Sequence, residues 1–383
     1  MERKHYLDNI RWMTVVLVMV YHVLYIFNSQ AVVSNFPVQG IELLDGFLYI
    51  VYPWFMTILF VVAGVCAKHA LAKKSGKAFL KDRFVRLILP SFFVPMLIGW
   101  FCGYVTDYYT DIFSGNGDKM PGIIKYAIYC AIGEGPMWFA RELFLAVLIL
   151  MLIRKIDKKG RLDALCKRMK WWGFIVLFFV FWGSSYVLNA PLIEVYRNGI
   201  YIISFLMGYY IFSTETHIST LEKAGKLLVP AALLLMAGYY TYMRIVIEPQ
   251  ATDDVLTTVN YTSKSVLQHP FTNLYAWIAM LAIFSVARKH LNFYNRFSAY
   301  MTKANFGYYA LHYPALAIVA FFTLEKTNLP IWGCYLVNLF GMIVLSTLLY
   351  LVLSKIPVLR TLTLGIRQRG KQDASQGRNS QAL

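Results

Sequence analysis

A series of apolar stretches, each about twenty residues long, constrains the fold more than any other feature of this chain. Short polar segments separate the stretches along almost the whole sequence. A helix of roughly twenty apolar residues is long enough to cross the ~30 Å hydrocarbon core of a bilayer. Hydrophobic residues make up 58% of the 383 residues and charged residues only 15%, which is far more apolar than a soluble domain. The pattern predicts an all-α membrane protein.

We expect about ten membrane helices in one bundle, near residues 12–30, 47–67, 87–106, 136–153, 171–189, 199–213, 226–243, 270–287, 306–322 and 332–353. The first stretch is too long for a signal-peptide core, so we expect it to remain as a membrane helix. Residues 120–134 are too short to span and predict a re-entrant or interfacial helix. The spans form one expected domain, 1–355, followed by a basic polar tail, 356–383, that we expect to be disordered.

Lysine and arginine are concentrated in alternate segments between the expected spans. Segments 68–86, 154–170 and 288–304 are basic, as is the tail from Lys355, whereas 106–119 and 248–264 are rich in Asp, Thr and Asn. By the positive-inside rule, the basic segments and both termini are predicted to be cytoplasmic. Orientation in the bilayer therefore explains the net charge of +17, and we expect no nucleic-acid partner.

The cysteines give no sign of a metal site or a disulfide framework. All five are scattered, without a CxxC pair or a Cys/His cluster at metal-ligand spacing: Cys66, Cys102, Cys130, Cys166 and Cys334. We therefore expect no metal and no bound cofactor.

Arg11 and His22 stand out in the first apolar stretch, LDNIRWMTVVLVMVYH. At about 100° per residue their eleven-residue spacing places both on one helix face, with an axial separation of about 16 Å. We expect Arg11 at the cytoplasmic mouth and His22 near mid-bilayer, where an imidazole can act as a general base. The alternative is structural: Arg11 extends to the lipid headgroups and His22 hydrogen-bonds a neighbouring helix.

Two arginines, Arg83 and Arg86, precede the third expected span in KDRFVRLILP. On an α-helix the i and i+3 positions share one face, and two guanidinium groups there would suit a phosphorylated ligand. Ordinary positive-inside charge in contact with lipid phosphates is the alternative.

Two further pairs of residues lie in later spans. Trp138 and Glu142 are one turn apart in EGPMWFARELF, beside Arg141. Trp138 and Glu142 are candidates for lining a ligand pocket. The alternative is that Arg141 and Glu142 form a purely structural ion pair. Tyr308 and His312 lie at i and i+4 in FGYYALHYP, where they either line the same cavity or make an interhelical hydrogen bond.

These residues together resemble the acyltransferase-3 family of ten-helix membrane acyltransferases. The first helix of that family carries an Arg-x10-His pattern like that of Arg11 and His22, and RFVR (83–86) resembles its Arg-x-x-Arg motif. The segment WFMTILFVVAGV is similar to its second helix, although Ala63 stands where many members have serine. FGYYALHYP resembles its Tyr-x-x-x-His-x-Pro segment. The resemblance covers about residues 5–355.

The resemblance implies transfer of an acyl group, commonly acetyl, from cytoplasmic acyl-CoA to a hydroxyl of an extracytoplasmic or cell-envelope carbohydrate. Acyl-CoA is then a co-substrate, and the bilayer of a bacterial plasma membrane is the expected location. LDNIR and GPMWFARELF resemble the branch that includes glucan biosynthesis protein C, which implies succinyl-CoA as the other candidate donor. The oligomeric state stays open.

A transporter or flippase of an anionic or lipid-linked substrate is the main alternative, because it would use the same intramembrane charges as a permeation path. The absence of recognisable inverted repeats in the sequence argues against it. A receptor or scaffold is a third possibility, but it would not require a polar stripe within the membrane.

Overall fold

The computed structural model describes residues 4–29, 36, 38, 40–188, 197–250 and 259–366. All regular structure in these ranges is helical, which confirms the all-α class. Eight helices, some built from several consecutive segments, are long and apolar enough to cross a membrane. They are α1 (His5–Ile26), α2–α3 (Glu42–Val51 and Phe55–Leu71), α4 to α6 (Gly76–Thr110), α8 with the turn before it (Gly135–Ile156), α12 with its extension (Glu215–Gln250), α14 (Pro270–His290), α15 (Arg296–Lys326) and α16 (Ile331–Lys355).

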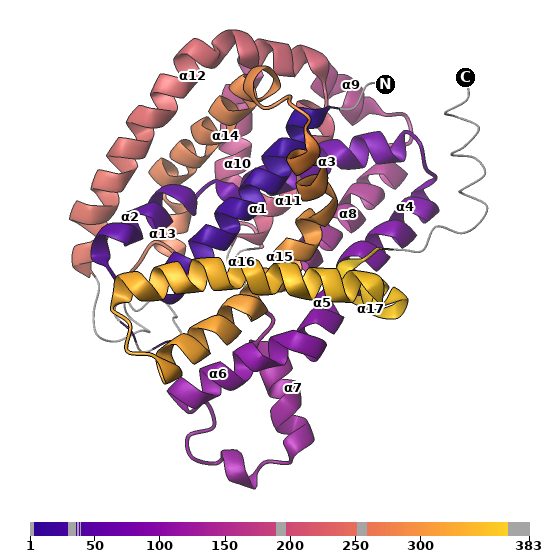
Figure 1. Ribbon diagram of the computed structural model, residues 1–383. Helices are drawn as coiled ribbons and strands as arrows, with labels where there is room; N and C mark the ends of the chain where they lie inside the picture. Colours follow the sequence, from indigo (N-terminus) through magenta and orange to yellow (C-terminus); the bar gives the residue numbers. More distant parts are fainter. Residues whose placement is uncertain are drawn as a thin grey trace.

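The expected count of ten spans is not confirmed, because two of the ten correspond to shorter apolar helices. The spans predicted near 171–189 and 199–213 correspond to α10 (Gly173–Ser184) and to α11 (Asn198–Met207) with its π-helical extension. A twelve-residue helix such as α10 is only about 18 Å long, less than the hydrocarbon thickness. The short helix expected within 120–134 is present as α7 (Gly122–Ile132), which packs against α6 (Trp100–Thr110) at the lower end of the molecule in Figure 1.

Pro53 interrupts the second long helix between α2 and α3. Proline has no backbone N–H, so the helical hydrogen-bond ladder is broken there and carbonyl groups need other donors. The carbonyl of Ile50 accepts from the Tyr275 hydroxyl and from Nε1 of Trp54, each at 2.8 Å. Side chains from elsewhere in the bundle therefore stabilise the break.

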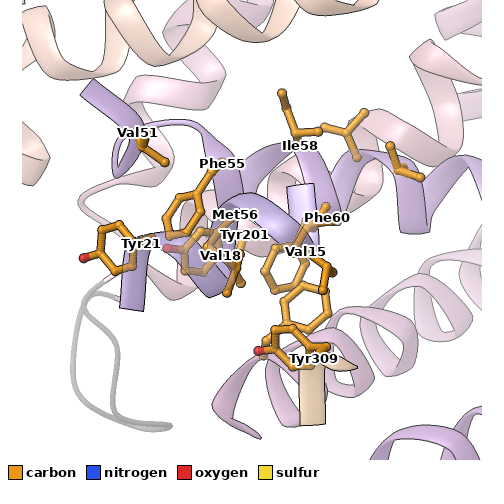
Figure 2. Close-up of a cluster of buried hydrophobic side chains, with 14 of the residues drawn as sticks. Val15, Val18, Tyr21, Val51, Phe55, Met56, Ile58, Phe60, Tyr201 and Tyr309 are labelled. Atoms are coloured by element: carbon orange, nitrogen blue, oxygen red, sulfur yellow. The ribbon is translucent and has the colours of Figure 1, made fainter. Parts of the chain in front are cut away.

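The bundle is organised around α1 and α3. Figure 1 shows α1 inside the molecule, and it contacts α2, α3, α14, α15 and α16. Helix α3 lies very close to α11 because Gly64 faces the backbone of Phe205 and Gly208 faces that of Val61, leaving no room for a Cβ atom at either glycine. Buried side chains from α1 and α3 meet in the cluster of Figure 2, beside Tyr201 and Tyr309. In contrast, α12 lies at the edge of the bundle.

Part of the tail that we expected to be disordered is ordered. Residues Pro357–Leu364 form α17, which packs against α5 (Leu89–Val94) and α16. Proline begins this helix, Gly365 ends it in the left-handed conformation (φ 63°), and Thr363 and Leu364 are buried. Sequence composition did not predict this short amphipathic helix. Residues 367–383 lie outside the described residues.

Candidate functional site

The central feature of the site is a direct contact between two histidines from opposite ends of the chain. Nε2 of His312 on α15 lies 3.2 Å from Nδ1 of His22 on α1, and their ring centroids are 5.0 Å apart. His312 is completely buried, whereas His22 is half-buried. The structure therefore brings together two candidate residues that lie 290 positions apart in the sequence.

The backbone around the two imidazoles determines which nitrogens carry protons. Nδ1 of His22 lies 2.8 Å from the carbonyl of Val18, and Nδ1 of His312 lies 2.8 Å and 3.1 Å from the carbonyls of Tyr309 and Tyr308. Because a carbonyl oxygen can only accept, both Nδ1 atoms must donate. In its neutral form His312 then accepts at Nε2 from His22, and Nε2 of His22 keeps a free lone pair. No described residue hydrogen-bonds to that atom.

His22 lies four residues before the end of α1 at Ile26. It is thus within about 6 Å of one end of its helix, measured along the axis. The expected position near mid-bilayer relied on a span at 12–30, whereas α1 covers His5–Ile26. Arg11 remains about 16 Å away along the same continuous helix.

Tyr308 does not approach His22 through its side chain. Its hydroxyl lies 3.0 Å from that of Tyr300 and 2.9 Å from Oγ1 of Thr347 on α16, and its ring stacks on Tyr350. The next residue, Tyr309, donates its hydroxyl to the carbonyl of Pro136 just before α8. Tyr308 therefore joins α15 to α16, while Tyr309 anchors the start of α8 beside the histidine pair.

A small cavity lies one turn beyond His22. Its volume is about 10 Å³, and it is lined mainly by apolar side chains: Ile26, Phe36, Cys102, Val105, Tyr313, Leu316 and Ala317. The ring of Tyr313 lies 5.2 Å from that of His22, which connects the cavity to the histidine pair. A cavity of this size has room for about one water molecule, so it is too small for a substrate group in this conformation.

The three candidate arginines lie in one charged neighbourhood near the start of α1. Arg11 and Arg86 both act electrostatically on Arg83. Arg11 pairs with Asp8 at 2.7 Å, and the start of α1 is held by Asn9, which donates to the carbonyls of residues 291 and 293. The arrangement concentrates positive charge where α1 begins.

Arg83 and Arg86 have different surroundings, contrary to the expectation of a shared helix face. A π-helical turn covers Phe84–Ile88, and its i→i+5 hydrogen bonding rotates the two positions apart compared with an α-helix. The Arg83 guanidinium lies 5.0 Å from the ring centroid of Phe79, and its Nε is buried without a hydrogen-bond partner. Arg86 is 58% exposed and pairs with Asp82 at 3.1 Å.

Trp138 and Glu142 both lie on the buried side of α8. Trp138 stacks on Tyr201 with ring centroids 5.4 Å apart. Arg141 pairs with Glu134 rather than with Glu142, because adjacent residues on a helix point in different directions. Glu142 is completely buried, and neither carboxylate oxygen has a hydrogen-bond partner. The structural Arg–Glu pair between neighbours is therefore not formed.

Sequence reasoning missed Arg197, which directly precedes α11 (Asn198–Met207). The side chain is 2% exposed and donates to the carbonyl of Pro53 at 2.9 Å, and its guanidinium lies 5.8 Å from the ring centroid of Tyr201. One signal was available: Arg197 is the sole lysine or arginine between Lys170 and Lys223.

Within the described part of the chain, no group of three or more His, Cys, Asp or Glu side chains is arranged to hold a metal ion. Polar atoms at the histidine pair belong to imidazoles, tyrosines and the backbone. These groups can transfer protons and form hydrogen bonds.

An apolar helical bundle with a histidine pair inside it and arginines near one end defines a class of multi-pass membrane protein with titratable side chains in its interior. The sequence model of the acyltransferase-domain family matches residues 4–352. The chain therefore belongs to the acyltransferase-3 family, as the resemblance indicated. The match does not distinguish branches, so the glucan biosynthesis protein C-like branch stays a prediction. Comparison with curated proteins and with solved structures gave no match.

Proposed function

We propose that this membrane acyltransferase transfers an acetyl or succinyl group from cytoplasmic acyl-CoA to a hydroxyl of an extracytoplasmic or cell-envelope carbohydrate. His22 acts as the general base, and His312 is its positioning residue. The observation that carries the proposal is the 3.2 Å contact between the two imidazoles, which leaves Nε2 of His22 unprotonated. General-base catalysis contributes typically about 10²- to 10⁴-fold in rate.

The donor binds at the arginine-rich end. The phosphates of acyl-CoA are held by Arg83 and Arg86, with Arg11 beside them. Arg83 supports this assignment best, because its Nε has no protein partner and the ring of Phe79 restrains the guanidinium. Arg86 can also bind a phosphate, but it must first give up its ion pair with Asp82.

The proposed reaction uses one base. Nε2 of His22 takes the proton of the acceptor hydroxyl as its oxygen attacks the thioester carbonyl. The new C–O bond forms, the C–S bond breaks, and the leaving thiolate of coenzyme A is protonated by the imidazolium of His22. His312 accepts the Nδ1–H hydrogen bond throughout and keeps the ring oriented, and the apolar surroundings limit hydrolysis of the thioester.

The acceptor approaches from the opposite side of the membrane. Trp138 and Glu142 are the proposed acceptor contacts, through stacking on a sugar face and a hydrogen bond to a hydroxyl. The buried carboxyl group of Glu142 supports this role because its oxygens have no other partner. The predicted orientation, with cytoplasmic termini in a bacterial plasma membrane, is part of the proposal.

The test uses the full-length protein in liposomes with labelled acetyl-CoA or succinyl-CoA and a set of envelope glycans, with coenzyme A release and glycan labelling as the readouts. His22→Asn keeps a donor near Nδ1 but removes Nε2, so we expect turnover to fall by at least about 100-fold. His217→Asn is the matched control, because His217 is a buried histidine on α12 whose Nε2 lies 2.9 Å from the Cys166 carbonyl.

Near-normal turnover by His22→Asn would contradict the role of this residue. Movement of a substrate across the liposome without release of coenzyme A would instead support the transporter alternative.

A further inference from the structure

Arg197 is buried and held by one edge of its guanidinium. Nη1 lies 2.9 Å from the carbonyl of Pro53 and 3.4 Å from that of Tyr52, at the break between α2 and α3. Only 2% of the residue is exposed. The helix break and Arg197 stabilise each other, because the break supplies free acceptors and the arginine supplies donors.

The other edge of the same guanidinium makes no hydrogen bond. Nε and Nη2 are both buried without a partner. The N–H groups of these two atoms point in the same direction from one edge of the guanidinium. This pair of parallel donors, the fork, matches the two oxygens of a carboxylate. Two parallel donors are therefore available at a fixed position inside the bundle.

A buried guanidinium stays charged and requires a counter-ion. Arginine does not lose its proton in proteins, and an unpaired charge in an apolar interior is strongly unfavourable. Among the described residues, no Asp or Glu carboxylate forms an ion pair with Arg197. Glu142 acts on Tyr201 from within the same region, yet it does not contact Arg197. The missing charge is one negative unit, which fits a carboxylate better than a doubly charged phosphate.

Aromatic rings connect this edge to the catalytic histidines. The ring of Tyr52, whose carbonyl faces Arg197, stacks on Tyr21 at 6.0 Å, and Tyr21 lies 5.3 Å from the ring of His22. Tyr201, beside Arg197, belongs to the same buried cluster as Tyr21 in Figure 2. A group held by Arg197 therefore lies in the region where the donor and acceptor meet.

We infer that the Nε/Nη2 edge of Arg197 binds a carboxylate of one of the two substrates, which makes the enzyme selective for a carboxylate-bearing donor or acceptor. The inference rests on the proposed acyl transfer and adds a specificity residue to it. The carboxylate belongs either to a dicarboxylic acyl group on the donor or to an acidic sugar in the acceptor. Either carboxylate would bind to the same Nε and Nη2 donors.

The first measurement compares matched substrates on the wild-type protein in liposomes. The donor arm compares succinyl-CoA with butyryl-CoA, its nearest uncharged counterpart, and the acceptor arm compares a glucuronate-containing oligosaccharide with a neutral one of equal length. We expect kcat/KM to favour the carboxylate-bearing substrate by about 10- to 100-fold in one arm, as for hydrogen bonds to charged groups. Equal kcat/KM values in both arms overturn the proposal without any variant.

The second measurement assigns the selectivity to Arg197. Arg197→Gln should remove the preference by raising KM for the charged substrate, while the neutral substrate is affected much less. Arg197→Lys should retain part of it, because a lysine keeps the charge but not the fork. A preference that survives in Arg197→Gln would overturn the assignment.

A binding experiment separates this inference from the proposed function. Calorimetry on His22→Asn measures ligand affinity without turnover, with succinyl-CoA, butyryl-CoA and the two oligosaccharides as probes. Tighter binding of a carboxylate probe that disappears in the His22→Asn, Arg197→Gln double variant supports the site even if no transfer activity is found. Equal affinities contradict the site even if acyl transfer is demonstrated.

Discussion

Arg141 forms its ion pair with Glu134, seven residues earlier, and leaves its neighbour Glu142 buried without a hydrogen-bond partner. The first carboxylate stabilises the start of α8, where the carbonyl of Pro136 also accepts from Tyr309. The carboxylate of Glu142 makes no hydrogen bond that would explain its burial. A polar group buried in this way is unfavourable unless a ligand completes its hydrogen bonding.

Replacing Glu142 by Gln should therefore separate stability from function. We expect the melting temperature to stay unchanged or rise, since an unpaired carboxyl group is removed from an apolar site. The kcat/KM for the carbohydrate acceptor should fall by about tenfold, whereas KM for acyl-CoA should not change. Thermal unfolding and initial-rate kinetics check the two parts, and an unchanged acceptor kcat/KM would exclude a role in acceptor binding.

His312 should act through its acceptor atom and not merely by filling space. His312→Ala removes the acceptor for the Nδ1–H of His22, so we expect activity to drop by at least about tenfold. His312→Gln offers a carbonyl oxygen in its place and should recover a substantial part of the loss. If the two variants were equally inactive despite equal folding, the positioning role would be wrong. At each pH tested, activity should decrease from the wild type to His312→Gln to His312→Ala.

The arginines near the start of α1 should contribute unequally to donor binding. Arg83→Gln should raise the Kd for coenzyme A by about tenfold, because Arg83 has a buried, unpartnered Nε. Arg86→Gln should have a smaller effect, since Arg86 is exposed and already paired with Asp82. Lys81→Gln, in the same exposed segment, is the control for overall charge. Calorimetry at two salt concentrations checks the order, and a larger effect at Lys81 would contradict it.

Gly64 should be required for close packing of α3 against α11. A Cβ atom there would overlap the carbonyl of Phe205, so Gly64→Ala forces the helices apart and should destabilise the protein by about 1–3 kcal/mol. Gly183→Ala is the matched control, because nothing lies within 4 Å of a Cβ at that position in α10. That control should be neutral or stabilising. Equal melting temperatures for the two variants would show that the contact between α3 and α11 tolerates a methyl group.

An acid-sensitive ion pair between Asp163 and Lys68 connects α9 (Arg161–Lys167) to the end of α3. Partial burial acts to raise the pKa of Asp163, but hydrogen bonds from Lys167 and Lys68 outweigh it, so the pKa lies below its usual range. A lowered pKa stabilises the fold above the unfolded value of about 3.9, and this contribution disappears as the pH falls through the folded pKa. Wild type should exceed Asp163→Asn in melting temperature at pH 7, and the difference should shrink below about pH 4. A constant difference would contradict the assignment.

The features that the sequence predicted are those with a local physical cause. Hydropathy alone indicates the long membrane helices, because a segment that crosses a bilayer must satisfy its own backbone and present apolar side chains. The spacing of Arg11 and His22 predicts a shared stripe because α1 is a continuous α-helix over both residues. Hydropathy overestimated the length of α10, since apolar composition does not specify helix length, whereas the span predicted at 199–213 agrees with α11 and its extension.

The features that it did not predict depend on tertiary contacts or on a change of helix type. The π-helical turn that separates Arg83 from Arg86 has no marked sequence signal. The free edge of Arg197 depends on a helix break 144 residues away, at Pro53. The contact between His22 and His312 depends on how α15 packs against α1, which no spacing along the chain encodes.

The separation of His22 and His312 by 290 residues also determines when the site can exist. α1 is the first of these helices to be synthesised, and α15 follows only after about 15–60 s at synthesis rates of roughly 5–20 residues per second. Until then His22 has no imidazole partner, so an incomplete chain in the membrane lacks the positioned base of the proposed mechanism. Under the proposed mechanism, catalysis begins only after nearly the whole bundle has been inserted, and nascent chains cannot hydrolyse acyl-CoA wastefully.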